Sequence, residues 1–254
     1  MMELLTGTYH LANMNMKLKR DFNLQVFNTL TRKKEKFTTL KKGVVKMYSC
    51  GPTLHKVHTH IGNLWAYTFA DFSKRYFQFH GYQVIDVIKF TDVDDHTISE
   101  CNTDKEALKA YTDNHITDFL RQIALLNIST PTHLPRLTDY IDDVVDAISK
   151  LIDAEVTYNA NDSLYLSISK IFNYGELADL GKIKYLKKNA QRRLKAFVDD
   201  DKEDINDFCL WKAWRENEGN IFWNTKYGKG RPGWHLGCSV ISRKLLGDSF
   251  DLHL

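Results

Sequence analysis

A histidine-rich loop between an apolar run and a helix has the residue types of a phosphate-binding site. The run 43–50 reads as a short buried strand, and a helix is predicted to begin near Gly62. A helix start offers free N–H groups and the positive end of the helix dipole to an anion. His60 can donate an N–H to a phosphate oxygen, Thr53 can add a hydroxyl, and Gly62 lets a flat base approach the backbone. A His-rich surface loop before an ordinary helix has the same residue types, so spacing alone leaves both interpretations open.

The cysteines are a second group of residues that could do chemistry, because thiolates bind zinc well. They are Cys50, Cys101, Cys209 and Cys238, with no Cys-x-x-Cys pair among them. So sparse a set does not suggest a disulfide framework, and it favours a reducing, cytoplasmic compartment. A lone buried cysteine commonly serves as a small hydrophobic residue. On a helix His235 and Cys238 could face one ion, although a packing role for His235 is the simpler interpretation.

The elements around the histidine loop are predicted to form a β-α-β unit. Aromatic residues recur along the helix at spacings of four and three, and this face is expected to point inward; it comprises Trp65, Phe69, Phe72, Tyr76 and Phe79. Gly81 is expected to end the helix, and the Val- and Ile-rich run 82–91 is typical of a central parallel strand. Strand, helix and strand in this order predict an α/β fold with a Rossmann-like parallel sheet.

Two more helices are predicted farther along the chain, over 104–127 and 138–152, with Thr138 as a plausible N-cap of the second. The residues expected to face inward are Leu108, Ile116, Phe119, Ile123 and Leu126 in the first, and Ile141, Val144, Val145, Ile148 and Ile152 in the second.

The pattern changes after the second of these helices. Alternating residues over 156–168 predict a hairpin. The segment 182–195 is strongly basic and 199–204 is almost wholly acidic. Such charge runs are usually solvated surface, although the basic one could approach nucleic-acid phosphates. We assign roughly 135–229 to an insertion.

Composition places the chain among ordinary globular proteins. Its 254 residues are 43% hydrophobic and 26% charged, which excludes a disordered or low-complexity chain. A net charge of +3 is too weak to indicate nucleic-acid binding by itself. No run approaches the ~20 apolar residues of a membrane span, so no membrane partner is expected. Residues 1–23 are expected to be a flexible leader rather than a targeting sequence.

Ordered motifs connect these features to a known family. His60-Ile-Gly-Asn63 after Cys50-Gly-Pro-Thr53 resembles the HIGH signature of class I aminoacyl-tRNA synthetases. The other blocks are Thr91-Asp-Val-Asp-Asp95, Asp207-Phe-Cys-Leu-Trp-Lys212, Gly230-Arg-Pro-Gly-Trp-His-Leu-Gly-Cys-Ser239 and Ser249-Phe-Asp-Leu-His253. In this order, from about residue 24 to the end, they resemble the cysteinyl-tRNA synthetases.

The resemblance implies the domain organisation of a HIGH-type nucleotidyl transferase interrupted by a connective peptide. Residues 1–23 would be the leader, 24–134 the first half of the Rossmann catalytic domain, 135–229 the inserted connective-peptide region, and 230–254 the start of the second half. The chain would then end before the Lys-Met-Ser-Lys-Ser loop and the anticodon-binding domain.

Site residues carry over from the family by position. The ATP-binding set is Gly51, His60, Gly62 and Asn63, with His60 and Thr53 acting on the phosphates and Mg²⁺ accompanying ATP. Thr91 and Trp234 would line the pocket for substrate cysteine. Cys50 and Cys238 would bind one zinc ion, whose two further ligands are expected beyond Leu254. Cys209 is expected in the core and Cys101 matches no motif, while Asp92, Asp94 and Asp95 are expected to cap the next helix.

The implied reaction joins cysteine and ATP to give cysteinyl-adenylate and pyrophosphate, then transfers cysteine to the 3′ end of tRNA(Cys). The cysteine carboxylate is the nucleophile, so the protein would supply positioning and charge stabilisation. A monomer is expected. A ligase for a small-molecule acceptor, as in mycothiol synthesis, and a non-catalytic binding module remain alternatives. The sequence departs from the family pattern at Asn63, Trp65, His96 and Gly237.

Overall fold

A three-stranded parallel sheet forms the centre of the molecule, in the order β10-β3-β4. The computed structural model describes residues 23–254 except 56–58, 102, 178–201 and 205. The strands are β3 (Val44–Thr53), β4 (Gln83–Thr91) and β10 (Leu252–His253). Residues 133–136 add parallel bridges on the far side of β4, from His133 to Val87 and from Arg136 to Phe90. The predicted strands and their parallel pairing are confirmed.

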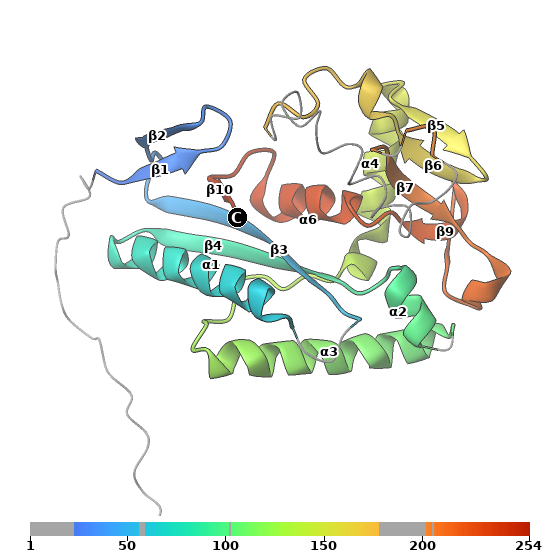
Figure 1. Ribbon diagram of the computed structural model, residues 1–254, viewed down its shortest axis with the longest axis horizontal. Coiled ribbons are helices and arrows are strands. Elements are labelled where there is room, and N and C mark those ends of the chain that lie inside the picture. The colour runs from blue at the N-terminus through green and yellow to red at the C-terminus, as the bar shows by residue number, and fades with distance from the viewer. Residues whose placement is uncertain (1–22, 56–58, 102, 178–201, 205) are drawn as a thin grey trace, which may run out of the picture.

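Helices cover both faces of this sheet (Figure 1). Helix α1 (Ile61–Phe79) lies on one face with α3 (Lys105–Leu125) alongside it, and α6 (Leu236–Leu246) lies on the other. Both β3 and β4 are largely buried, as parallel strands between helix layers must be. The short helix α2 (Asp95–Glu100) follows β4 directly, and a hairpin of β1 (Gln25–Asn28) and β2 (Lys33–Lys36) precedes β3.

An antiparallel sheet of order β5-β6-β7-β9-β8 lies beyond α4 (Ile141–Asp153). Its strands are β5 (Thr157–Ala160), β6 (Ser163–Leu166), β7 (Phe208–Ala213), β8 (Trp223–Thr225) and β9 (Gly228–Pro232), with short 3-10 helices at Leu137–Tyr140, Ile168–Lys170 and Glu216–Glu218. The hairpin predicted over 156–168 is confirmed as β5 and β6. Strand β9 spans the boundary expected between the insertion, which ends at 229, and the segment that begins at 230. The division into domains stays a prediction. The basic run 182–195, the leader through residue 22 and residues 199–201 of the acidic run lie outside the described residues.

One core joins the two sheets. Val87 of β4, Ile148 of α4, Trp211 of β7 and Ile241 of α6 belong to the same buried cluster. The positions predicted to face inward on α3 and α4 are mostly buried or partly buried, but Leu126 and Ile152 are exposed. Thr138 is not an N-cap: it lies in the 3-10 turn before α4, where its hydroxyl donates to Asp92 at 2.6 Å.

The orientation predicted for α1 is wrong. Its buried residues are Tyr67, Ala70, Lys74 and Phe77, whereas Trp65, Phe69, Phe72 and Phe79 are exposed. The helix carries apolar residues on two faces, and a 3.6-residue period cannot tell which of them meets the sheet. Gly81 ends the helix as predicted, with φ of +82° and an N–H donated to the Gln78 carbonyl. No helix in the described part of the chain is long and apolar enough to cross a bilayer.

Candidate functional site

The end of β3 carries the first group of predicted site residues. Strands β3 and β4 pair regularly from Val44 to Cys50, and the register then shifts between Cys50 and Thr53. A Cβ on Gly51 would lie 1.9 Å from the Lys89 carbonyl oxygen. Glycine is therefore required here by the approach of the two strands, and its contact with ATP stays a prediction.

His60 caps the helix that follows the histidine loop. The Gly62 N–H donates to His60 Nδ1 at 3.0 Å, so His60 is the N-cap of α1. Because Nδ1 accepts, the proton of the neutral ring belongs on Nε2, and that atom is left to donate. This tautomer is the one that binding a phosphate oxygen requires. A Cβ on Gly62 would lie 3.1 Å from His60 Nδ1, so the residue also leaves room for the cap.

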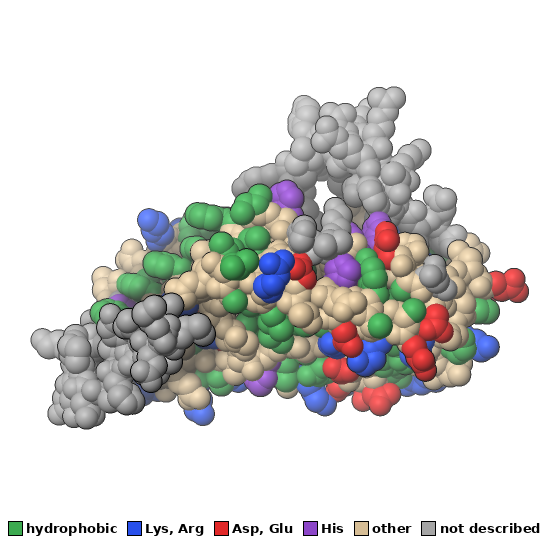
Figure 2. All heavy atoms as spheres, turned by 90° about the horizontal axis from the view of Figure 1, so that it is seen from below, with side chains coloured by type: hydrophobic (Ala, Val, Ile, Leu, Met, Phe, Trp, Pro, Cys, Tyr) green, Lys and Arg blue, Asp and Glu red, His purple; other side chains and the backbone are tan. Residues whose placement is uncertain are grey.

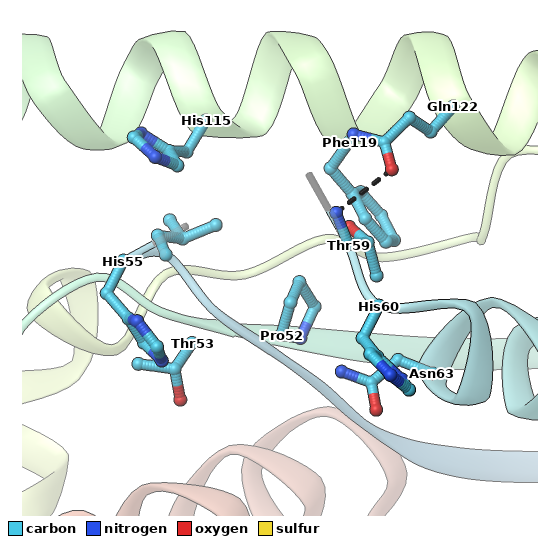
Figure 3. A pocket seen from close by; sticks show the side chains of 10 residues that line it. Pro52, Thr53, His55, Thr59, His60, Asn63, His115, Phe119 and Gln122 are labelled. Carbon is cyan, nitrogen blue, oxygen red and sulfur yellow. Dashed lines mark hydrogen bonds between the residues drawn. The ribbon is translucent and has the colours of Figure 1, made fainter. Parts of the chain in front are cut away.

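A cleft brings three of the predicted residues together (Figure 3). Thr53, His60 and Asn63 lie on one wall, and α3 contributes the other wall. Its lining is Pro52, Thr53, Leu54, His55, Thr59, His60, Asn63, His115, Phe119 and Gln122. Sequence reasoning missed the residues from α3, because nothing in the sequence places that helix beside the loop.

Two of these α3 side chains have polar roles in the cleft. The Gln122 side-chain oxygen accepts from the Thr59 N–H at 3.0 Å, which fixes the loop just before His60. His115 contacts the Tyr111 carbonyl through Nδ1 at 2.8 Å, and its buried Nε2 has no partner among the described residues. The cleft therefore offers ring nitrogens from both walls.

The two predicted zinc ligands lie together, although 188 residues separate them. Cys50 is on β3 and Cys238 is on α6, and their sulfur atoms are 3.7 Å apart. Two Zn–S bonds of about 2.3 Å at a tetrahedral angle place their sulfurs about 3.8 Å apart. The spacing therefore fits zinc, but no third metal-ligating side chain joins the pair within the described residues.

The two thiols share a proton unequally. A hydrogen bond from Cys50 lowers the pKa of Cys238 below its usual range, and the nearby Lys89 ammonium lowers it further. The same hydrogen bond, together with burial, raises the pKa of Cys50. The lowered pKa favours the thiolate form of Cys238, which is the form that binds metals.

Beside this pair, Lys89 and Thr91 extend the site along β4. Lys89 is fully buried, and its Nζ donates to Thr91 Oγ1 at 2.7 Å. The Thr91 hydroxyl accepts this bond and keeps its own proton for a further acceptor. Sequence reasoning did not find Lys89, because a lysine within an apolar strand has no motif of its own.

The segment before α6 carries the aromatic part of the site. Trp234 is half exposed, and its ring lies 4.5 Å from that of His235, which in turn packs on Phe208 at 5.0 Å. Burial lowers the pKa of His235. These contacts agree with the packing role expected for His235.

The three Asp residues after β4 have separate structural roles. Asp94 caps α2 by accepting from the Thr97 N–H at 2.8 Å, as predicted. The capping prediction is wrong for Asp92, which accepts from Thr138, and for Asp95, which binds Lys212 and Arg231. Lys212 belongs to the motif block 207–212 and Arg231 to the block 230–239. Asp95, in the block 91–95, therefore links three blocks that are far apart in the chain.

The other residues that depart from the family pattern, and the other two cysteines, also contact neighbouring residues. A Cβ on Gly237 already meets Leu137 Cδ1 at 2.6 Å, so a glutamate there needs Leu137 to move. The His96 ring lies 4.9 Å from the ring of His55 at the edge of the cleft. Cys101 is buried and donates to the Ile98 carbonyl, and Cys209 is half-buried on β7.

Comparisons with known proteins match this arrangement. The family model described as tRNA synthetases class I (C) catalytic domain matches residues 36–254. The chain belongs to this family. The relatives include proteins named cysteine–tRNA ligase, and the resemblance found in the motifs is thereby confirmed.

The similarity extends over nearly the whole chain but only part of each relative. The protein of Lactobacillus gasseri is 41% identical over 91% of this chain and 48% of its own length, and that of Chlamydia felis is 42% identical over 91% and 48%. The protein of Pyrococcus furiosus is 39% identical over 91% and 46%. The chain thus spans about half the length of the relatives it matches.

A solved structure shows the same fold. A protein of Campylobacter jejuni assigned as an arginyl-tRNA synthetase superposes with a TM-score of 0.50 at 11% identity, over 84% of this chain and 47% of the other. At this identity the likeness concerns the fold alone, and it agrees with the predicted α/β class.

Proposed function

We propose that this chain forms the first half of the catalytic fold of a cysteine–tRNA ligase. The observation that carries the proposal is the pair of thiols held 3.7 Å apart at the carboxyl ends of the parallel strands, where ligands of open α/β sheets bind. Cysteine is the amino acid whose own sulfur suits a metal held by thiolates.

The cleft beside His60 is the proposed site of ATP. The Nε2 proton of His60 donates to a phosphate oxygen at the start of α1, and the Thr53 hydroxyl adds a second donor. Asn63 stands at the last position of the HIGH signature, where the family has a histidine. Its side-chain amide can still donate a hydrogen bond but cannot carry a charge. Gly62 lets a flat base approach the backbone, Gly51 belongs to the same proposed ATP-binding set, and Mg²⁺ accompanies the phosphates. Catalysis follows from positioning and charge stabilisation, since the substrate carboxylate is the nucleophile.

The thiol pair is the proposed site of cysteine recognition. Cys50 and Cys238 hold one zinc ion, and further ligands come from outside the described residues. When bound, zinc supplies a position that a cysteine thiolate occupies and a serine hydroxyl does not. Thr91 orients the substrate through its free hydroxyl proton, with Lys89 fixing the oxygen, and Trp234 forms an aromatic wall.

The acceptor is proposed to be the 3′ end of tRNA(Cys), with the protein acting as a cytoplasmic monomer. A ligase for a small-molecule acceptor would also form cysteinyl-adenylate first. The two functions therefore differ in the acceptor to which cysteine is transferred. The matches to proteins named cysteine–tRNA ligase support the tRNA acceptor.

The decisive measurement is ATP–pyrophosphate exchange with cysteine and zinc. We expect exchange that depends on cysteine, is at least ~10-fold weaker with serine, and is lost in Cys238→Ser. Cys209→Ser is the matched control, since Cys209 is a cysteine of β7 that does not belong to the pair. Equal exchange with serine would contradict the proposal. A complete lack of exchange with zinc present would show that the isolated chain is not an active synthetase by itself.

A further inference from the structure

Lys89 is a buried lysine whose charge has no carboxylate beside it. Lysine and arginine side chains normally lie at the surface of a protein, and Figure 2 shows such side chains on one face of this molecule. The exposed fraction of Lys89 is 0%, and its ammonium donates to the neutral hydroxyl of Thr91 at 2.7 Å. Among the described residues no carboxylate pairs with it. An ammonium taken out of water is costly unless negative charge lies close to it.

Lys74 is the other buried lysine in the described part of the chain, and it has the usual environment of a buried cation. Its ammonium binds the Asp86 carboxylate and the Thr130 carbonyl, each at 3.0 Å. An ammonium has three N–H donors, and Thr91 takes only one of those on Lys89. The comparison shows that Lys89 has charge and donors available that Lys74 does not.

The side chain of Lys89 lies on the same face of the parallel sheet as the thiol pair. Lys89 on β4 is the direct neighbour of Cys50 on β3 in the strand register, so both side chains point to one face. Cys50 meets Cys238 of α6 on that face, and Thr91 lies two residues beyond Lys89 on the same side of β4. The hydrogen bond from Cys50 is the main cause of the lowered pKa of Cys238, and the charge of Lys89 adds to it. The ammonium is therefore close to the sulfur atoms.

Negative charge collects at this place when the proposed cysteine site is filled. Thiols that bind a metal ion lose their protons, so Cys50 and Cys238 together balance the two positive charges of zinc. The thiolate of a substrate cysteine brings one further negative charge. Lys89 supplies one positive charge, already buried and fixed in position by Thr91.

We propose that Lys89 is a specificity-determining residue for cysteine, because its buried ammonium compensates the substrate thiolate at the metal held by Cys50 and Cys238. The proposal rests on the proposed function, since it takes this pair to be the site of cysteine recognition. A substrate without a thiolate brings no charge for Lys89 to compensate. Lys89 therefore favours cysteine over serine in addition to the metal itself.

Cysteine binding to the zinc-loaded chain, measured by calorimetric titration, tests the proposal. We expect Lys89→Met, which keeps the length of the side chain and removes its charge, to weaken cysteine binding about 10- to 100-fold. The affinity for S-methylcysteine, which has no thiolate, should stay unchanged. Lys89→Gln keeps a donor for Thr91 without the charge, and we expect it to lose as much affinity for cysteine as Lys89→Met.

Lys74→Met is the matched control, because it removes the other buried ammonium. We expect it to keep the wild-type affinity for cysteine and to lower the melting temperature of the metal-free chain, since Asp86 loses its partner. Lys89→Met leaves no carboxylate unpaired, so the metal-free chain should melt no lower than the wild type. This second measurement needs neither zinc nor cysteine.

The opposite results overturn the proposal. Unchanged cysteine affinity in folded Lys89→Met overturns the role of Lys89 alone and leaves the proposed function standing. Wild-type affinity in Lys89→Gln assigns Lys89 only to holding Thr91, and an equal loss in Lys74→Met assigns the effect to packing. A wild-type chain that binds zinc, as measured by competition with a chelator, but does not bind cysteine overturns the proposed function and the role of Lys89 with it.

Discussion

At the scale of single residues, the proton shared by Cys50 and Cys238 separates these thiols from the other cysteines. The pKa of Cys238 is lowered, mainly by the hydrogen bond from Cys50, so this thiol ionises at a lower pH than a free thiol, whose pKa is ~8.5. We expect iodoacetamide to modify Cys238 first at pH 7, with a pH midpoint well below that of a free thiol. Peptide mapping by mass spectrometry measures the order, and added zinc should protect the site. Cys101 is the internal control, because burial raises the pKa of its thiol. A midpoint for Cys238 near that of a free thiol would contradict the shared proton.

Substitution can separate the capping role of His60 from its proposed role in binding phosphate. Asparagine is an excellent N-cap but cannot reach as far as imidazole Nε2. We expect His60→Asn to keep the stability of the chain and to weaken ATP binding about 10- to 100-fold, as for loss of a hydrogen bond to a charged group. His60→Ala should weaken binding equally and also lower the free energy of unfolding by ~1 kcal/mol. Calorimetric titration and urea unfolding measure the two effects. Equal affinity of His60→Asn and wild type would remove His60 from the phosphate site.

At the scale of elements, Asp95 and Arg231 hold α2 against β9. Arg231 is 2% exposed and binds both Asp95 and the buried Glu218. Arg231→Met leaves the buried Glu218 carboxylate without a charged partner, and we expect a loss of about 3–5 kcal/mol in the free energy of unfolding. Lys212→Met removes the more exposed partner of Asp95 and should cost less than ~1 kcal/mol. Urea unfolding of both variants tests the difference, and equal effects would show that burial of Arg231 does not matter.

The elements also show what the sequence could predict. The strand, helix and strand around His60 followed from local patterns, because β-branched runs and glycine stops act over a few residues. The side of α1 that meets the sheet did not follow, since Tyr67 and Phe77 form as regular a face as Trp65 and Phe69. The α3 wall of the cleft was missed because His115 and Gln122 come near the loop only when α3 packs against it in the folded chain, and no local sequence pattern shows that. The meeting of Cys50 with Cys238 was expected from the family resemblance and not from their spacing.

At the scale of the whole molecule, the thiol pair joins parts of the chain that are 188 residues apart in the sequence. Cys50 lies near the end of β3 in the parallel sheet, and Cys238 lies on the helix that returns from the antiparallel sheet. A ligand that bridges them binds the folded chain only, so zinc should stabilise the whole molecule by mass action. At a free zinc concentration of about 100 Kd the gain is about 2.7 kcal/mol.

Thermal unfolding with and without zinc measures this coupling. We expect zinc to raise the melting temperature of the wild-type chain in a concentration-dependent way, and a chelator to reverse the rise. Cys50→Ser and Cys238→Ser should each abolish the shift, because one remaining thiolate cannot bridge β3 and α6. Cys101→Ser keeps the pair and should keep the shift, whatever its effect on the unliganded stability. A shift that survives in Cys238→Ser would place the zinc elsewhere and would separate metal binding from the contact between β3 and α6.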